Sequence, residues 1–325
     1  MSWQPEVDEI NKRRKLAQQL GGEHSVARHH KMGKLTLRER FDALLDEGSF
    51  SEQGRMAGGA TLDDDGEVES FDPANYLLGS GTINERTVVV GGEDFTLKGG
   101  SPNSAGYRKS VYAEYFAMEL RSPLVRLMEG GGGSVAAGGG DPKKPRTVGE
   151  PPHTPPRLQV IAEAMNKIPI VSAALGPVAG LPAARLVASH FTVMTKKTAQ
   201  ILIAGPAVVE RALGGSLSKE ELGGADVHLY SGVADNLAED EYDAFRQIRT
   251  FLSFFPQNAW QSAPRSPCLD PVDRCEESLL SLVPRDRRET FDMHELIEAV
   301  VDRDSFFEYS AHYGPSLITG YARLN

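Results

Sequence analysis

Cysteine, excess basic charge and long apolar runs are all missing or scarce in this sequence. Its 325 residues include 2 cysteines, Cys268 and Cys275, which are too few for a disulfide framework and lie outside any CxxC spacing. Acidic residues outnumber basic ones by 45 to 35, so the net charge is −10, whereas proteins that bind nucleic acid through its phosphates are normally basic. No apolar run approaches the roughly 18 residues of a membrane-spanning helix. We therefore expect no nucleic-acid partner and no membrane partner.

Motifs for metals, nucleophiles and targeting are missing as well. The 8 histidines show no HExxH or HxH spacing, so we expect no metal in this chain. Neither GxSxG nor the phosphate-binding pattern GxxxxGK[ST] occurs. Segment 1–18 has no apolar stretch like that of a secretory signal, and its early acids are unlike a transit peptide. Together with the low cysteine content, these features predict a cytoplasmic protein.

Helix-like and strand-like segments alternate along the chain. Thr36 and Glu39 form a capping box, which an apolar stripe at helical spacing follows. Runs of β-branched and apolar residues predict buried strands at 87–90, 124–128, 168–175, 191–194 and 200–203. Helices are predicted at 7–20, 108–120, 158–167, 181–188, 206–213, 218–222 and 238–254. This alternation predicts an α/β layered fold with a largely parallel sheet.

Glycine-rich stretches separate several of these segments. Gly91 and Gly92 are expected to interrupt one strand, and segment 130–156, with eight Gly and six Pro in 27 residues, is expected to form a loop or a lid. Residues 176–180 are expected to form the turn before helix 181–188. Because proline has no N–H and suits the start of a helix, the free amides there are those of Gly180 and Leu181. Such amides can polarise a carbonyl, although a plain strand-to-helix turn fits the same pattern.

Six residues recur at a constant spacing of 256 positions. They are Glu39, Ala43, Asp46, Ser49, Phe50 and Glu52, which match Glu295, Ala299, Asp302, Ser305, Phe306 and Glu308. Gly79 and Asn84 match Gly320 and Asn325 at a spacing of 241. The repetition predicts a duplicated domain. We expect an N-terminal helix in 1–30, a first domain in 31–256, a linker in 257–286 and the start of a second copy in 287–325, which lacks a 172-residue counterpart and packs on the first domain or on a partner.

A series of segments carries a family resemblance, in family order, over most of the chain. The segments are 32–40, 46–50, 94–96, 99–101, 176–180, 205–206, 220–225 with His228, 231–234, 291–293, 302–308, 314–315 and 320–324. On these, the chain resembles the carboxyltransferase (β) subunit of biotin-dependent acyl-CoA carboxylases of the propionyl-CoA and methylcrotonyl-CoA type. The resemblance implies a crotonase-like (ClpP/crotonase) α/β fold, built as a layered β-α superhelix and duplicated, with the second copy only begun. The chain departs from the family at Gly130–Ser134, Leu181, Pro182, His190 and Asp235.

The resemblance also implies a function. A carboxyl group would move from carboxybiotin to the α carbon, or the vinylogous γ carbon, of an acyl-CoA through an enolate held in backbone oxyanion holes. The implied site residues are Gly180 and Leu181 for the hole, Gly99, Gly100, Arg108, Lys109, Gly131, Gly132 and Gly133 for acyl-CoA, and Gly223 and Gly224 as lining. The implied partners are a biotin carboxylase, a biotin carrier on a separate domain, and further copies in a dimer or hexamer. Two alternatives stay open: a non-catalytic or split relative that binds CoA or assists assembly, and another crotonase-type thioester enzyme such as a decarboxylase component.

Overall fold

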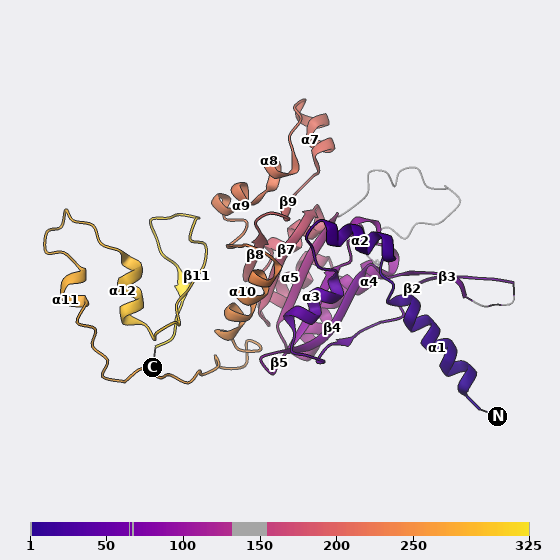
Figure 1. Cartoon of the computed structure of the whole chain (residues 1–325), viewed down its shortest axis with the longest axis horizontal. Coiled ribbons are helices and arrows are strands. Elements are labelled where there is room, and N and C mark those ends of the chain that lie inside the picture. The colour runs from indigo at the N-terminus through magenta and orange to yellow at the C-terminus, as the bar shows by residue number, and fades with distance from the viewer. Residues whose placement is uncertain (1, 65, 67, 132–154, 325) are drawn as a thin grey trace.

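One mixed sheet forms the centre of the molecule. The computed structural model describes residues 2–64, 66, 68–131 and 155–324. Within these residues an eight-stranded sheet has the order β1-β4-β5-β6-β7-β8-β10, and β9 pairs with β7 beyond the end of β8 (Figure 1). The strands are β1 (Ser51–Glu52), β4 (Tyr76–Ile83), β5 (Arg86–Glu93), β6 (Leu124–Gly131), β7 (Ile170–Ala179), β8 (Phe191–Thr195), β9 (Gln200–Leu202) and β10 (Asn236–Ala238).

The sheet is antiparallel at one edge and parallel through its centre. Strand β4 runs antiparallel to β1 and β5, whereas the pairs β5–β6, β6–β7, β7–β8, β7–β9 and β8–β10 are parallel. Because β7 pairs with three strands, the predicted largely parallel sheet with residues 170–174 at its centre is confirmed. The antiparallel edge agrees with the common occurrence of such edges in otherwise parallel α/β sheets.

Helices cover both faces of this sheet. They are α1 (Gln4–Ala17), α2 (Glu23–Lys31), α3 (Leu37–Leu44), α4 (Ser104–Leu120), α5 (Arg157–Met165), α6 (Leu181–Val187), α7 (Pro206–Leu213), α8 (Lys219–Gly223), α9 (Ala225–Ser231), α10 (Glu241–Ser253), α11 (Leu279–Leu282) and α12 (Met293–Val300). Strand side chains alternate between the faces, so Val88 and Val90 pack under α3 and α10 while Val89 packs under α4. No helix in the described part of the chain combines the length and apolar character needed to cross a bilayer.

Three details of the predicted elements were wrong. Strand β5 continues through Gly91 and Gly92, where a Cβ would collide with Tyr76 and with the Leu127 carbonyl, so these glycines permit close packing within the sheet. The expected turn at 176–180 is mostly strand, because β7 extends to Ala179 and pairs there with β6 and β9. Position 238 ends a strand, and α10 starts three residues later.

Two short strands near the C-terminus repeat the local structure around β1. Strand β11 (Phe307–Glu308) pairs with β12 (Gly320–Tyr321) in the register of β1 with β4, shifted by 256 and 241 residues. The bounds of α12 are those of α3 shifted by 256 residues. The amide of Asp46 donates to the Thr82 carbonyl at 2.8 Å, and the equivalent amide of Asp302 donates to the Arg323 carbonyl at 2.9 Å. The internal repeat therefore extends to backbone hydrogen bonds, whereas the proposed domain boundaries stay a prediction.

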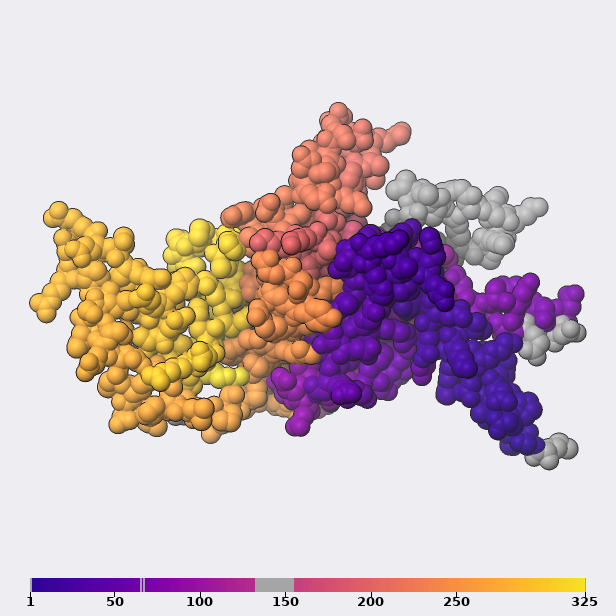
Figure 2. All heavy atoms as spheres, viewed as in Figure 1, coloured from indigo at the N-terminus to yellow at the C-terminus, as the bar shows by residue number. Residues whose placement is uncertain are grey.

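The repeated unit packs on the main sheet body, as predicted for residues 291–325. The Tyr321 ring lies 5.0 Å from the Phe255 ring and 5.7 Å from the Phe251 ring, and the Phe307 ring lies 5.6 Å from the Phe191 ring. Figure 2 shows this yellow segment in contact with the orange surface of α10. An aromatic cluster thus joins the C-terminal unit to the core.

Candidate functional site

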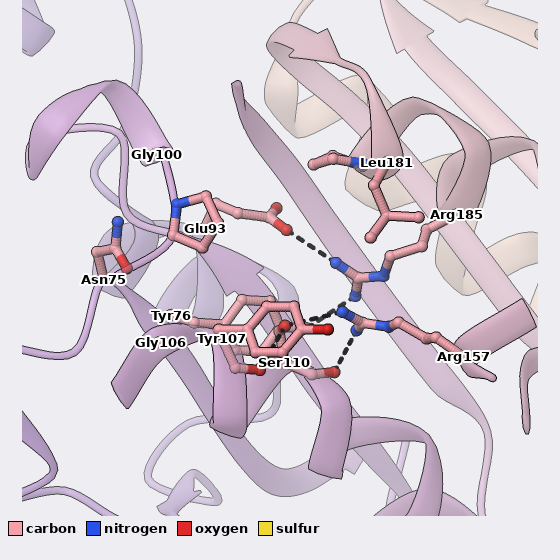
Figure 3. Close-up of a pocket in the computed structure, with 12 residues that line it drawn as sticks. Asn75, Tyr76, Glu93, Gly100, Gly106, Tyr107, Ser110, Arg157, Leu181 and Arg185 are labelled. Atoms are coloured by element: carbon pink, nitrogen blue, oxygen red, sulfur yellow. Dashed lines mark hydrogen bonds and ion pairs between the residues drawn. The ribbon is translucent and has the colours of Figure 1, made fainter. Parts of the chain in front are cut away.

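A pocket lies where β5 and β7 end and the chain leaves the sheet for α4 and α6. Its space is about 430 Å³ including the open mouth. Its lining is Asn75, Tyr76, Glu93, Gly100, Pro102, Gly106, Tyr107, Ser110, Arg157, Leu181, Pro182 and Arg185, most of which are drawn in Figure 3. Carboxyl ends of parallel strands are where open α/β sheets bind ligands, so this pocket is the candidate site.

Arg185 is the central cation of the pocket wall. It is buried, donates to Glu93 Oε1 at 3.0 Å and to the Tyr76 hydroxyl at 3.4 Å, and lies between the two residues in Figure 3. Burial alone would lower the pKa of Arg185, but Tyr76, Glu114 and Glu93 together raise it. Arg185 is therefore a fixed positive charge that links the first turns of α6 to the ends of β4 and β5.

Behind Arg185, the fully buried carboxylate of Glu114 is surrounded by arginines. Glu114 accepts from Arg126 at 3.0 Å and from Arg157 at 3.4 Å, and Arg185 Nε lies 3.7 Å away. Burial opposes ionisation of Glu114, yet the three cations lower its pKa. Burial likewise lowers the pKa of Arg126 to about 10. These groups form a rigid charged frame between α4, β6, α5 and α6.

Sequence analysis missed this frame, although a signal was present. Glu114 interrupts the apolar part of one helix, and Arg126 interrupts the apolar run of a strand. A charge inside an otherwise buried segment requires a partner in the fold, so such positions predict internal ion pairs even when the partner is unknown.

The start of α6 differs from the expectation in one amide. Gly180 has φ 71°, and its N–H donates to the Leu202 carbonyl at 2.9 Å, so it is not available to a ligand. Pro182 has no N–H. The first residues of a helix lack carbonyl partners within the helix, which leaves the amides of Leu181 and Ala183 as donors. The expected pair Gly180 and Leu181 is thus corrected to one shared member, Leu181, because β9 provides an acceptor for Gly180.

The predicted glycines divide into two groups. Gly100, with φ 70°, lines the pocket, and a Cβ there would collide with the backbone of Glu129 and Gly130. Gly99 precedes it with φ 63°, and a Cβ on Gly131 would lie 3.5 Å from Ser101 Oγ. The loop before α4 and the end of β6 therefore meet closely. Gly132 and Gly133 lie outside the described residues.

The other predicted residues do not line the pocket. Arg108 is exposed on α4. Lys109 turns towards the opposite side, where its Nζ lies 3.3 Å from the Gly54 carbonyl and 3.6 Å from Glu52, and burial lowers its pKa. A Cβ on Gly223 would collide with the Ile201 carbonyl, so Gly223 lets the α8–α9 turn approach β9, and Gly224 separates the two helices.

A second buried ionic network fixes the end of β6. Glu129 accepts from Lys34 and from Arg40, each at 2.7 Å, and His29 Nε2 lies 3.6 Å from it. Gly176 of β7 lies against this carboxylate, since a Cβ there would overlap its atoms. The network therefore holds α2 and α3 to the strand that leads into the glycine stretch beginning at 130.

One group of possible metal ligands occurs among the described residues, far along the chain from the pocket. Ligand atoms of Cys268, Asp270 and Asp302 lie within 4.8 Å of one another. Asp270 already accepts from Arg274 at 2.5 Å and from the Arg303 amide at 2.9 Å. We assign no metal to this group, because guanidinium and amide donors already take up its carboxylate.

Comparison with known proteins gives a consistent result. A family model described as the carboxyl transferase domain matches residues 28–325. The propionyl-CoA carboxylase beta chain of Cereibacter sphaeroides is 33% identical over 319 residues, covering 98% of this chain and 61% of that protein. The methylmalonyl-CoA decarboxylase subunit alpha of Veillonella parvula is 32% identical over 320 residues, covering 94% of this chain and 58% of that protein.

Solved structures include a similar fold. The hexameric transcarboxylase 12S, with methylmalonyl-coenzyme A and methylmalonic acid bound, superposes with a TM-score of 0.84 at 28% identity, covering 100% of this chain and 62% of that one. The chain thus spans about three fifths of the length of the relatives that it matches.

Proposed function

The chain belongs to the carboxyl transferase family and has its crotonase-like fold, and from this premise we propose that it supplies the acyl-CoA half of a biotin-dependent carboxyltransferase site. The proposal rests chiefly on one observation. The amide of Leu181 starts a helix beside a pocket at the carboxyl ends of the sheet, within the segment that matches the family. The reaction would carboxylate the α carbon, or the vinylogous γ carbon, of the acyl group through its enolate.

In this proposal the chain's part is to bind and polarise the thioester. The Leu181 and Ala183 amides, aided by the positive end of α6, would donate to the thioester oxygen as negative charge develops on it. Gly100, which has no side chain, leaves room for the acyl group. Removing one donor of such a hole typically lowers the rate by about 10²–10³.

The charged frame would position this helix start. Arg185 and Glu93 join α6 to β5, and Arg126 donates to the carbonyls of Arg185 at 2.8 Å and Ala188 at 3.2 Å, near the end of α6. Because both ends of the short helix are held, the Leu181 amide keeps its direction without reorganisation when charge develops. These arginines are positioning residues in this scheme.

The Leu181 side chain would limit the acyl group. It is 41% exposed and lines the pocket. A branched apolar side chain at the thioester position narrows the space beside the α carbon, where family members usually have glycine. We therefore propose that short acyl groups are accepted and that long or branched groups are disfavoured.

The remaining half of the site is assigned to partners. Biotin on a separate carrier supplies the carboxyl group and the base in such reactions. A carboxyltransferase needs one donor set for the thioester and another for the biotin, and we assign the Leu181 turn to the thioester, so no step at biotin is derived for these residues. The proposed partners are a biotin carboxylase, its carrier and further copies of this chain, in the cytoplasm.

Acyl-CoA binding can be tested without partners. Isothermal titration of the 325-residue chain with CoA, propionyl-CoA and methylmalonyl-CoA should give saturable binding, and the thioesters should bind more tightly than CoA. Arg211, exposed on α7, provides a control variant, Arg211→Ala, which should bind equally well. Absence of binding by every CoA compound would refute the proposal. With biotin carboxylase and a carrier added, a carboxylation assay over the same panel tests the transfer step.

A further inference from the structure

A second pocket lies at the opposite end of the sheet. It includes Asn84 and Arg86 at the turn between β4 and β5, and Pro123 just before β6. Since β5, β6 and β7 are parallel, these residues mark their amino ends, whereas Leu181 follows the carboxyl end of β7. The pocket encloses about 740 Å³ including its open mouth and is therefore separate from the candidate acyl-CoA site.

Four arginines line this pocket, and no acidic residue is among its lining within the described part of the chain. The four are Arg86, Arg249, Arg265 and Arg323. Asn84, Ser253, Gln257 and Ser266 provide further polar groups, and the rest of the lining is apolar. An accumulation of four positive charges without a lining carboxylate is unusual in a chain whose net charge is −10.

Three of these arginines bond to neutral backbone oxygens. Arg86 donates to the carbonyls of Leu252 at 2.9 Å and Phe255 at 2.6 Å. Arg249 donates to the Ala43 carbonyl at 2.7 Å, and Arg323 donates to the Ser253 carbonyl at 2.8 Å. These contacts fix the guanidinium groups at helix ends but do not neutralise them, and burial lowers the pKa of Arg86 accordingly.

The fourth arginine has no such contact. Arg265 is exposed and forms neither a hydrogen bond nor an ion pair with another described residue. The nearest carboxylate to the group, Asp46, accepts from Thr82 Oγ1 at 2.6 Å and from the amides of Asn84 and Glu85 at 3.0 and 2.8 Å. Its pKa is lowered mainly by the Thr82 hydroxyl, with Arg249 as a lesser cause. Asp46 is thus engaged elsewhere and does not line the pocket.

We propose that this arginine pocket binds a phosphate group, either inorganic phosphate or the terminal phosphate of a nucleotide. Planar guanidinium forks match phosphate oxygens, and fixed, half-buried arginines bind them with little loss of side-chain entropy. Arg86 and Arg249 belong to the main sheet body, whereas Arg265, Ser266 and Arg323 follow α10. A bound phosphate therefore links the C-terminal unit to the body. This inference does not rest on the acyl-CoA chemistry proposed above.

Phosphate binding can be measured directly on the full chain. Isothermal titration and thermal unfolding are run with inorganic phosphate, with ADP, and with acetate and chloride at matched ionic strength. Phosphate should bind saturably and raise the unfolding temperature more than chloride or acetate does, because a ligand of the folded state stabilises it. Tighter binding of ADP at the same residues identifies a nucleotide as the source, and tighter binding of inorganic phosphate identifies the free anion.

Variants of Arg265 locate the site without disturbing the fold. Arg265→Ala and Arg265→Glu change an exposed side chain without internal contacts, so both should fold, and each should weaken phosphate binding by about tenfold or more. Arg211→Ala removes an equally exposed arginine on α7 and should leave phosphate binding unchanged. The inference is overturned if phosphate does no more than acetate or chloride, or if its binding survives both Arg265 variants.

Discussion

Arg40 and Glu241 lie 201 residues apart in the sequence and form two hydrogen bonds of 2.8 Å in the interior. The same guanidinium donates to Glu129 at 2.7 Å, so one arginine joins α3, α10 and the end of β6. Burial would lower the pKa of Arg40, but Glu129 and Glu241 raise it. The capping box before α3 places Arg40 on the inner side of that helix, and the end of β6 next to the candidate site is fixed as a consequence.

Replacing Glu241 should therefore be costly. Glu241→Gln leaves the Arg40 charge with one carboxylate fewer inside the protein, and breaking a buried ion pair typically costs about 3–5 kcal/mol. We expect the free energy of unfolding, measured by urea titration, to fall by an amount in this range. Glu239→Gln is the matched control, because Glu239 pairs with Lys196 at the surface and should lose less than about 1 kcal/mol. Equal losses in the two variants would contradict the proposed importance of the buried pair.

The sequence predicted local features of this region better than its distant contacts. The Thr36–Glu39 capping box and the stripe over Leu37, Phe41 and Leu44 depend on neighbours within one helix, and both are confirmed. The partners of Arg40 come from other elements, 89 and 201 residues away, and no local pattern identifies them. Residues near the candidate site follow the same rule.

At the candidate site, the start of α6 at Leu181 was predicted because glycine followed by an early proline is a local signal. The use of the Gly180 amide by Leu202 was missed, since it depends on how β9 pairs with β7. Lys109 was misjudged for the same reason, as its partner Glu52 lies on β1 at the sheet edge. The site line-up therefore required the tertiary structure.

The pH dependence of stability should report on His29. Its ring is buried, its Nε2 donates to the Leu35 carbonyl at 3.1 Å, and its pKa is lowered from 6.5, first by burial and then by Arg40 and Lys34 against the opposing effect of Glu129. The unfolded chain therefore takes up this proton at higher pH than the folded chain. Its contribution to stability is complete above pH 6.5 and is lost as the pH falls below that value.

His29→Gln keeps a donor for Leu35 and removes the titration. We expect the difference in the free energy of unfolding between about pH 7.5 and about pH 5.5 to be smaller in this variant than in the parent chain. His24→Gln, at an exposed position of α2, should leave that difference unchanged. Urea titrations at the two pH values give the comparison, and an unchanged difference in His29→Gln would count against the interpretation.

The repeated unit offers a test of how it is attached. A Cβ on Gly320 would collide with the Phe306 ring and the Phe307 carbonyl, as a Cβ on Gly79 would with Phe50 and Ser51. We expect Gly320→Ala to separate β11 from β12 while the central sheet stays folded. Amide hydrogen exchange should then become faster at Tyr321 and remain slow in β6 and β7. Gly215→Ala, where nothing lies within 4 Å of the added methyl, should change neither. Slow exchange at Tyr321 in Gly320→Ala would contradict the expected separation.

The proposed donor can be separated from its side chain by two substitutions at one position. Leu181→Pro removes the N–H at the first position of α6, where proline is tolerated, whereas Leu181→Ala keeps the N–H and shortens the side chain. In an assay with biotin carboxylase and carrier, Leu181→Pro should lower kcat for propionyl-CoA carboxylation by about 10²-fold or more, because the lost hydrogen bond strengthens as the enolate forms. Its affinity for CoA should stay near that of the parent chain. Leu181→Ala should keep kcat and accept bulkier acyl groups, since the pocket widens beside the thioester. A common loss of CoA binding in both variants would indicate a folding defect, which circular dichroism would reveal, while parental kcat in a folded Leu181→Pro chain would exclude this amide from the oxyanion hole.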